Sequence, residues 1–144
     1  MLIIEMTAIL SCAIFAGAAI YINFAEHPAR LECGVELTAR VFGPSYRRAA
    51  AMQASLAIIA TIAGMIVGIY SKHNLWFVGA ALIFFVVPFT LIVIMPTNKL
   101  LLEPSSRAAQ ETEVLLNKWG MLHAVRSISS SVAAILYVYL GITT

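Results

Sequence analysis

Hydrophobic residues occur along the chain in four long runs, at residues 2–24, 49–70, 75–95 and 121–140, and polar residues fill the stretches between them. Each run is close to the roughly 20 residues that a helix needs to cross the hydrocarbon of a bilayer. Helix is preferred to strand because the runs are continuous and because an open strand leaves its backbone unpaired in lipid. The pattern predicts an all-α fold, a single membrane-embedded bundle of four transmembrane helices covering residues 1–144.

The composition agrees with a membrane protein, since 61% of the residues are hydrophobic, 11% are charged and the mean hydropathy is +0.92. The formal net charge is only +2 and the Lys and Arg residues are scattered, which excludes the clustered basic surface of a nucleic-acid-binding protein. We expect a lipid bilayer as the surroundings and no nucleic acid as a partner. The first run carries Glu5 and no Lys or Arg where a signal peptide has its cationic segment, so we expect it to be retained.

Both long connections are amphipathic. From Arg30 to Phe42 one helical face carries apolar residues and Thr38, the other carries charged residues, and Gly43-Pro44 is expected to stop the helix. A second helix is predicted over residues 107–119, capped by Ser105 or Ser106 and running into the fourth span. The apolar faces are Leu31, Val35, Thr38 and Phe42 in the first helix, and Ala108, Thr112, Leu115, Leu116 and Trp119 in the second; the charged residues opposite are Glu32, Glu36 and Arg40, and Glu111 and Lys118.

The distribution of basic residues predicts the orientation in the membrane. The two long connections hold most of the Lys and Arg residues, whereas the turn at residues 71–74 holds only Lys72. Basic residues favour the cytoplasmic side, so we expect both long connections in the cytoplasm and both termini outside. The basic residues counted are Arg30, Arg40, Arg47 and Arg48 in the first connection, and Lys99, Arg107 and Lys118 in the second.

Small residues and cysteines give two further expectations. Ala60, Gly64 and Gly68 recur every four residues, as do Ser127 and Ser131, a spacing that favours close helix packing in membranes. Cys12 lies inside the first run and Cys33 outside it, so the two differ in depth and we expect free thiols.

Polar side chains at membrane depth indicate a functional site, because each charged group there costs roughly 2.5–3.5 kcal/mol even on lenient scales. In the fourth span one helical face holds Trp119, His123, Arg126, Ser130 and Tyr137. The last turn of the first span holds Asn23, Glu26 and His27, where Pro28 is expected to end the helix, and Pro96-Thr97-Asn98 is expected to close the third span. Pro88 is expected to kink the third span by freeing the carbonyl of Phe84.

Chain direction brings these polar sets to one membrane face, because the ends of spans one and three meet the starts of spans two and four. The sequence therefore predicts a pocket with polar walls and aromatic neighbours in that half of the bundle. Its expected contributors are Asn23, Glu26 and His27; Tyr46, Arg48 and Gln53; Asn98; and Trp119, His123 and Arg126.

Four motifs together resemble a family of four-helix membrane proteins that includes the anthrone oxygenases of aromatic polyketide pathways. The motifs are Glu26-His27-Pro28-Ala29-Arg30, residues 44–53, Pro96-x-Asn98, and Leu115-Leu116-x-x-Trp119-x-x-x-His123-x-x-Arg126. The resemblance implies oxidation of an anthrone or a similar phenolic ring by O2 without an added cofactor. Because such a ring reacts with O2 once a proton is removed, a base and an oxyanion partner are needed.

The expected roles follow from that chemistry. The candidate bases are His27 and His123, and the candidate oxyanion partners are Arg126 and Asn98. Trp119 would stack on a flat substrate. Asn23, Glu26 and Gln53 complete the expected substrate site.

Three alternative interpretations stay open at this stage. In the first, Glu26 pairs with Arg126 or Arg30 to close the bundle, and the histidines are hydrogen-bonding groups only. In the second, His27 and His123 bind haem or a metal ion, although no His-x-x-x-His spacing is present. In the third, the chain is a noncatalytic subunit of a larger membrane complex or a homo-oligomer.

Overall fold

The computed structural model describes residues 1–103 and 107–143, so the predicted cap at Ser105 or Ser106 lies outside the described residues. The described part is helical throughout its length apart from short turns and contains no strand, which confirms the all-α prediction. The elements are α1 (Leu2–Tyr21), the π-helical turn η1 (Ile22–Glu26), α2 (His27–Glu32), α3 (Val35–Ser71), α4 (Leu75–Phe89), the π-helical turn η2 (Thr90–Ile94), α5 (Met95–Leu102) and α6 (Ala109–Thr143).

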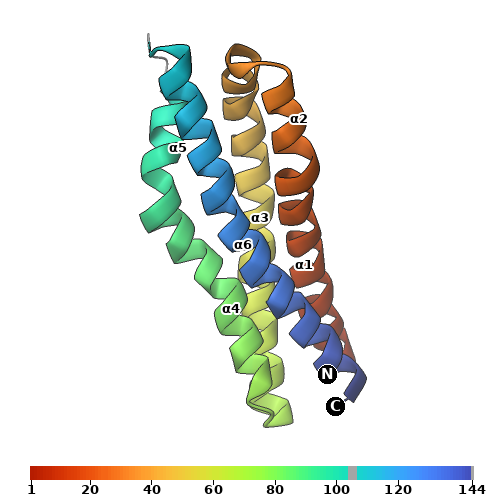
Figure 1. The fold of residues 1–144 in the computed structure, drawn as a ribbon. Helices are drawn as coiled ribbons and strands as arrows, with labels where there is room; N and C mark the ends of the chain where they lie inside the picture. The colour runs from red at the N-terminus through yellow and green to blue at the C-terminus, as the bar shows by residue number, and fades with distance from the viewer. Residues whose placement is uncertain (104–106, 144) are drawn as a thin grey trace.

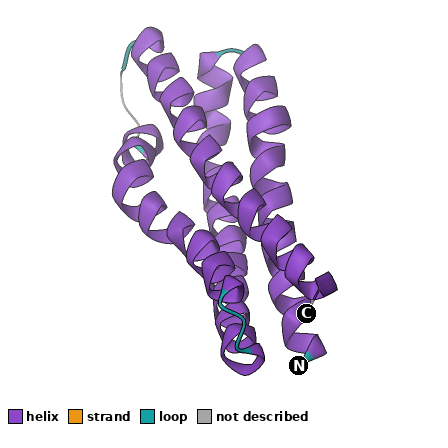
Figure 2. Cartoon of the chain, turned by 60° about the horizontal axis from the view of Figure 1, so that its bottom comes forward, coloured by secondary structure: helices purple, strands orange, loops and turns teal. Residues whose placement is uncertain are grey.

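Four of the helices formed by the described residues are long and apolar enough to cross a membrane (Figure 1). The first is α1 continued by η1 and α2, the second is α3, the third is α4 continued by η2 and α5, and the fourth is α6. The helices run alternately up and down, and both termini lie at one end of the bundle (Figures 1 and 2). We call the other end, where α2, α5 and the start of α6 lie, the polar end.

Each helix packs between two antiparallel neighbours. The first helix and α4 both contact α3 on one side and α6 on the other. The hydrophobic runs predicted from the sequence lie within these helices, but every helix continues beyond its run at the polar end. The bundle therefore extends past the hydrocarbon there and carries the polar side chains of both connections.

Pro28 and Pro96 do not end their helices, contrary to the prediction. His27 has helical angles (φ −67°, ψ −47°), and the chain continues helically to Glu32. Each proline is the second residue after a π-helical turn and lies in the first turn of the next α-helix. The wide π-helical turn leaves room for the proline ring, which would clash with the carbonyl of residue i−4 in a regular helix, so the helix continues.

The predicted stop at Gly43-Pro44 is also wrong, because α3 runs through both residues without interruption. The helix can continue because Gly43 has no Cβ to clash with the proline ring, and because Pro44 lies on the exposed side. The break occurs instead at Gly34, whose φ of +94° suits glycine. The predicted faces are confirmed, with Thr38 and Phe42 buried and the charged residues Glu32, Glu36 and Arg40 on the more exposed side.

The second connection helix runs straight into the fourth span, as predicted, and forms one helix with it. Leu116 and Trp119 of the predicted apolar stripe are buried. Ala108 is exposed, contrary to the prediction, because it precedes the first turn of α6. In the third helix Pro88 lies inside α4, and Figure 1 shows α4 and α5 pointing in different directions, in agreement with the expected kink.

Aromatic rings fill the space left by small residues of α3 and α4. A Cβ atom on Gly64 would overlap the Tyr137 hydroxyl, and one on Gly79 would overlap the Tyr137 ring. The same hydroxyl donates a hydrogen bond to the Ala60 carbonyl at 3.3 Å. Gly64 is therefore needed to seat a ring from α6, and not to bring two backbones together as its spacing suggested. Both cysteines are free thiols, as predicted.

Candidate functional site

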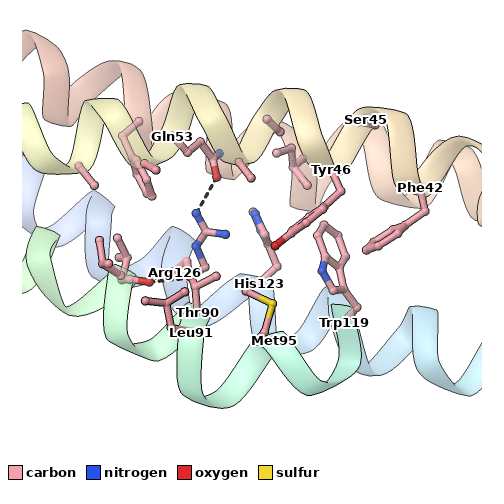
Figure 3. Close-up of a pocket in the computed structure, with 18 of the residues that line it drawn as sticks. Phe42, Ser45, Tyr46, Gln53, Thr90, Leu91, Met95, Trp119, His123 and Arg126 are labelled. Atoms are coloured by element: carbon pink, nitrogen blue, oxygen red, sulfur yellow. Dashed lines mark hydrogen bonds between the residues drawn. The ribbon is translucent and has the colours of Figure 1, made fainter. Parts of the chain in front are cut away.

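A pocket lies between the four helices in the half of the bundle near the polar end, where the sequence predicted it (Figure 3). It holds about 820 Å³ of empty space, including the part that opens to the outside. Most of its wall is apolar. Its polar lining residues are Glu26, Arg30, Ser45, Tyr46, Gln53, Thr90, His123 and Arg126, and its aromatic lining residues are Phe15, Phe42, Tyr46 and Trp119.

Arg126 places an uncompensated positive charge in this pocket. Its Nη2 donates a hydrogen bond to Gln53 Oε1 at 2.6 Å (Figure 3). Its guanidinium lies 5.5 Å from the ring centre of Phe15. Only 9% of Arg126 and 2% of Gln53 are exposed. No carboxylate of the described residues pairs with Arg126, and both Arg126 Nε and Gln53 Nε2 lack a partner. The pocket thus offers a cation, and two buried hydrogen-bond donors beside it have no partner.

His123 has a defined tautomer, because its neighbours have fixed hydrogen-bonding roles. Asn23 Nδ2 donates to the Gly120 carbonyl at 3.0 Å, so the amide oxygen of Asn23 must point toward His123. That oxygen lies 2.7 Å from His123 Nδ1 and also accepts from Ser127 Oγ at 2.6 Å. His123 Nδ1 therefore carries the hydrogen, and Nε2 keeps a lone pair that is available to a ligand in the pocket.

The same reasoning fixes the direction of a second chain of hydrogen bonds. The indole Nε1 of Trp119 is a donor only, and it lies 2.8 Å from Asn98 Oδ1. Asn98 Nδ2 then donates to the Tyr46 hydroxyl oxygen at 3.0 Å. Because Tyr46 accepts this hydrogen bond, its own hydroxyl hydrogen is free for the pocket. Asn98 itself is fully buried behind the lining and orients Trp119 and Tyr46.

Glu26 pairs with Arg30 one turn later, and Arg30 Nη2 also donates to Ser45 Oγ at 2.6 Å. These three side chains connect the end of the first helix to α3. Of the two partners that the sequence allowed for Glu26, the structure thus has Arg30 and not Arg126. Glu26 lines the pocket but does not neutralise the buried guanidinium.

His27 lies behind the pocket wall and is not part of the lining. Its Nε2 donates to the Leu116 carbonyl at 3.0 Å, and its ring packs 5.1 Å from the Trp119 ring and against Gly120. A Cβ on Gly120 would lie 2.9 Å from the imidazole. Among the described residues no group of three or more His, Cys, Asp or Glu side chains gathers in a geometry suited to a metal ion.

The predicted site residues thus fall into two layers. Glu26, Gln53, Trp119, His123 and Arg126 line the pocket, whereas Asn23, His27 and Asn98 lie behind it and hold lining residues or backbone in place. Arg48, which was expected to converge with them, is exposed.

Tyr46 was placed in the convergent set but not among the predicted site residues, although it lines the pocket. The sequence carries a usable signal for it, since Phe42, Tyr46 and Gln53 are spaced 4 and 7 residues apart and so share one helical face. Thr90 and Phe15 carry no comparable signal. They become visible only once the four helices are arranged in space.

Comparison with known protein families identifies the chain. The family model of anthrone oxygenase matches residues 42–136, which is more than half of the sequence. The chain belongs to the anthrone oxygenase family. The match covers most of the pocket lining, so the family region supplies the imidazole of His123, the guanidinium of Arg126 and the hydroxyl of Tyr46 described above. Searches of curated proteins and of solved structures gave no match.

Proposed function

We propose that this membrane protein uses O2 to oxidise an apolar phenolic ring compound of the anthrone type in the pocket near the polar end. The observation that carries the proposal is the buried guanidinium of Arg126, which has an amide oxygen as its partner and no carboxylate among the described residues. A buried charge of this kind is stabilised by a ligand that is or becomes an anion. An anthrone does so when it loses a ring proton, because the charge moves onto the carbonyl oxygen.

The reaction begins with proton removal. His123 Nε2 takes a proton from the ring CH2 group, and the resulting enolate oxygen accepts hydrogen bonds from Arg126 and Gln53. The electron-rich carbon then transfers its electrons to O2 and forms a C–O bond, which gives a hydroperoxide after protonation by the histidine. Loss of the second ring proton breaks the O–O bond and releases water.

Atoms and electrons balance in this sequence: CH2 and O2 become C=O and H2O. The carbon loses four electrons and the two oxygen atoms gain four, so O2 is the only oxidant required. Tyr46 is suited to donate to the second oxygen function of the substrate or to the departing hydroxide. Trp119 provides an aromatic wall for a flat ring system.

The direct test is turnover of anthrone by the purified protein in lipid nanodiscs. We expect O2 uptake and quinone formation above the uncatalysed rate, with one atom of isotopically labelled O2 in the product and the other in water. His123→Ala should reduce the catalysed rate by about 10²–10⁴-fold, as is typical for loss of a general base.

Ser131→Ala is the matched control, because Ser131 lies on the same helix and donates to the Ser127 carbonyl of its own helix. Its rate should equal that of the unmodified protein. Turnover that is unchanged in His123→Ala, or a wild-type rate no higher than that of protein-free nanodiscs, would reject the proposed reaction for this substrate.

A further inference from the structure

The exposure of its lining residues indicates that the pocket opens sideways, between α3 and η2. Two of the residues that line it, Ala54 on α3 and Leu91 on η2, are also exposed on the outside of the bundle, and 59% of Leu91 is exposed. The opening arises because α3 packs closely against α4 but has far fewer contacts with η2 and α5, the segments that follow α4. The side chains along the α3 edge are small, with Ala50 one turn before Ala54.

Both edges of this opening belong to uncharged stretches of chain. No Asp, Glu, Lys or Arg occurs between Arg48 and Lys72 or between Lys72 and Lys99. Large apolar side chains flank the opening on the outer surface, including Ile58 on α3 and Ile92 on η2. Such segments lie in hydrocarbon, so the opening faces lipid tails and not water.

The other direction out of the pocket is polar. Glu26, Arg30 and Ser45 form a hydrogen-bonded group between the first helix and α3. An apolar ring leaving the bilayer for that route would have to cross the charged surface of the polar end. The lateral opening avoids this charged surface entirely.

We propose that the opening between α3 and η2 is a portal through which apolar ligands enter the pocket directly from the bilayer. The ligand class is a flat, uncharged ring compound dissolved in lipid, together with O2, which is more soluble in hydrocarbon than in water. The identity of the ring compound rests on the proposed function, whereas the existence of the portal does not. A substrate arrives neutral through an apolar rim and acquires its charge only beside Arg126.

The test places a nitroxide spin label at Thr90, which lines the pocket on η2, through Thr90→Cys in a Cys33→Ser background. In lipid vesicles the label should collide frequently with O2 and rarely with a water-soluble nickel chelate. Ala54→Trp should lower the O2 collision rate several-fold by filling the rim. Met52→Trp is the control, because Met52 is exposed and lies two residues away, about 200° around the helix.

Nickel collisions as frequent as those with O2, or an O2 collision rate that Ala54→Trp leaves unchanged, would overturn the portal. Turnover of anthrone adds an independent readout, since Ala54→Trp should slow it and Met52→Trp should not. If no variant and no unmodified protein oxidises anthrone, the proposed function fails while the spin-label result still decides the portal. Circular dichroism of each labelled protein verifies that the bundle is intact.

Discussion

Replacing Arg126 with Met separates a ligand-binding charge from a structural one. If the guanidinium holds the bundle together, its removal weakens the fold. If it is kept for an anionic ligand, its removal abolishes activity and leaves the fold nearly as stable as before. The hydrogen bond to Gln53 and the contact with Phe15 are the interactions that the substitution removes.

The magnitudes favour the second outcome. Removing a guanidinium from membrane depth gains about 2.5–3.5 kcal/mol on lenient scales. Against this, an unpaired Gln53 oxygen costs about 1–3 kcal/mol, and the lost cation–π contact with Phe15 costs about 0.5–2 kcal/mol. The free energy of unfolding should therefore rise by no more than about 2 kcal/mol or fall by no more than about 2.5 kcal/mol, whereas breaking a buried ion pair costs about 3–5 kcal/mol. Turnover should fall about 10²–10³-fold, as for the loss of an oxyanion partner.

Unfolding by dodecyl sulfate in mixed micelles, followed by circular dichroism, measures the stability of Arg126→Met, and O2 uptake measures its activity. Arg48→Met serves as the control, because Arg48 is an exposed arginine on α3. It should change neither quantity. A destabilisation of about 3 kcal/mol or more combined with normal turnover would refute the assignment of Arg126 to the ligand.

Other predictions concern packing, the second histidine, sidedness and cofactors. Gly64→Leu should destabilise the bundle by displacing Tyr137, whereas Gly17→Leu should be tolerated because a Cβ atom on Gly17 would meet no atom within 4 Å; equal melting temperatures would contradict this. His27→Ala should lower the free energy of unfolding by about 1–3 kcal/mol through loss of a buried hydrogen bond; an unchanged stability would refute it. The exposed thiol of Cys33 should react with an impermeant maleimide only from the cytoplasmic side, and labelling from outside would reverse the orientation. The purified protein should show no haem absorption band, and a Soret band would restore the haem interpretation.

The four spans and the location of the pocket followed from the sequence because both depend on strong signals. Long apolar runs specify the helices, and a short list of polar residues at fixed depth specifies one end of the bundle. The inward face of α6, with His123 and Arg126, could be read from spacing alone. The burial of both residues agrees with that interpretation.

The helix boundaries and the separate roles of the site residues could not be predicted from the sequence in the same way. Pro28, Pro44 and Pro96 each signal a helix end, yet a preceding π-helical turn or glycine removes the local conflict. The roles of His27 and His123 differ because only His123 lines the pocket and because their partners differ. Leu116 accepts a hydrogen bond from Nε2 of His27, whereas Asn23 accepts one from Nδ1 of His123. Such partners come from distant parts of the chain, so no local pattern encodes them.

The two π-helical turns have a consequence for how such a chain can change over generations. Each wide turn amounts to one residue more than a regular α-helix would use, and each residue turns an α-helix by about 100°. Loss of one codon within Ile22–Glu26 would therefore swing His27 and Arg30 to another side of the first helix without altering either side chain. Thr90–Ile94 gives the third helix the same property. Short insertions and deletions at these two places, and not only substitutions, are thus a direct genetic route to a differently lined interior.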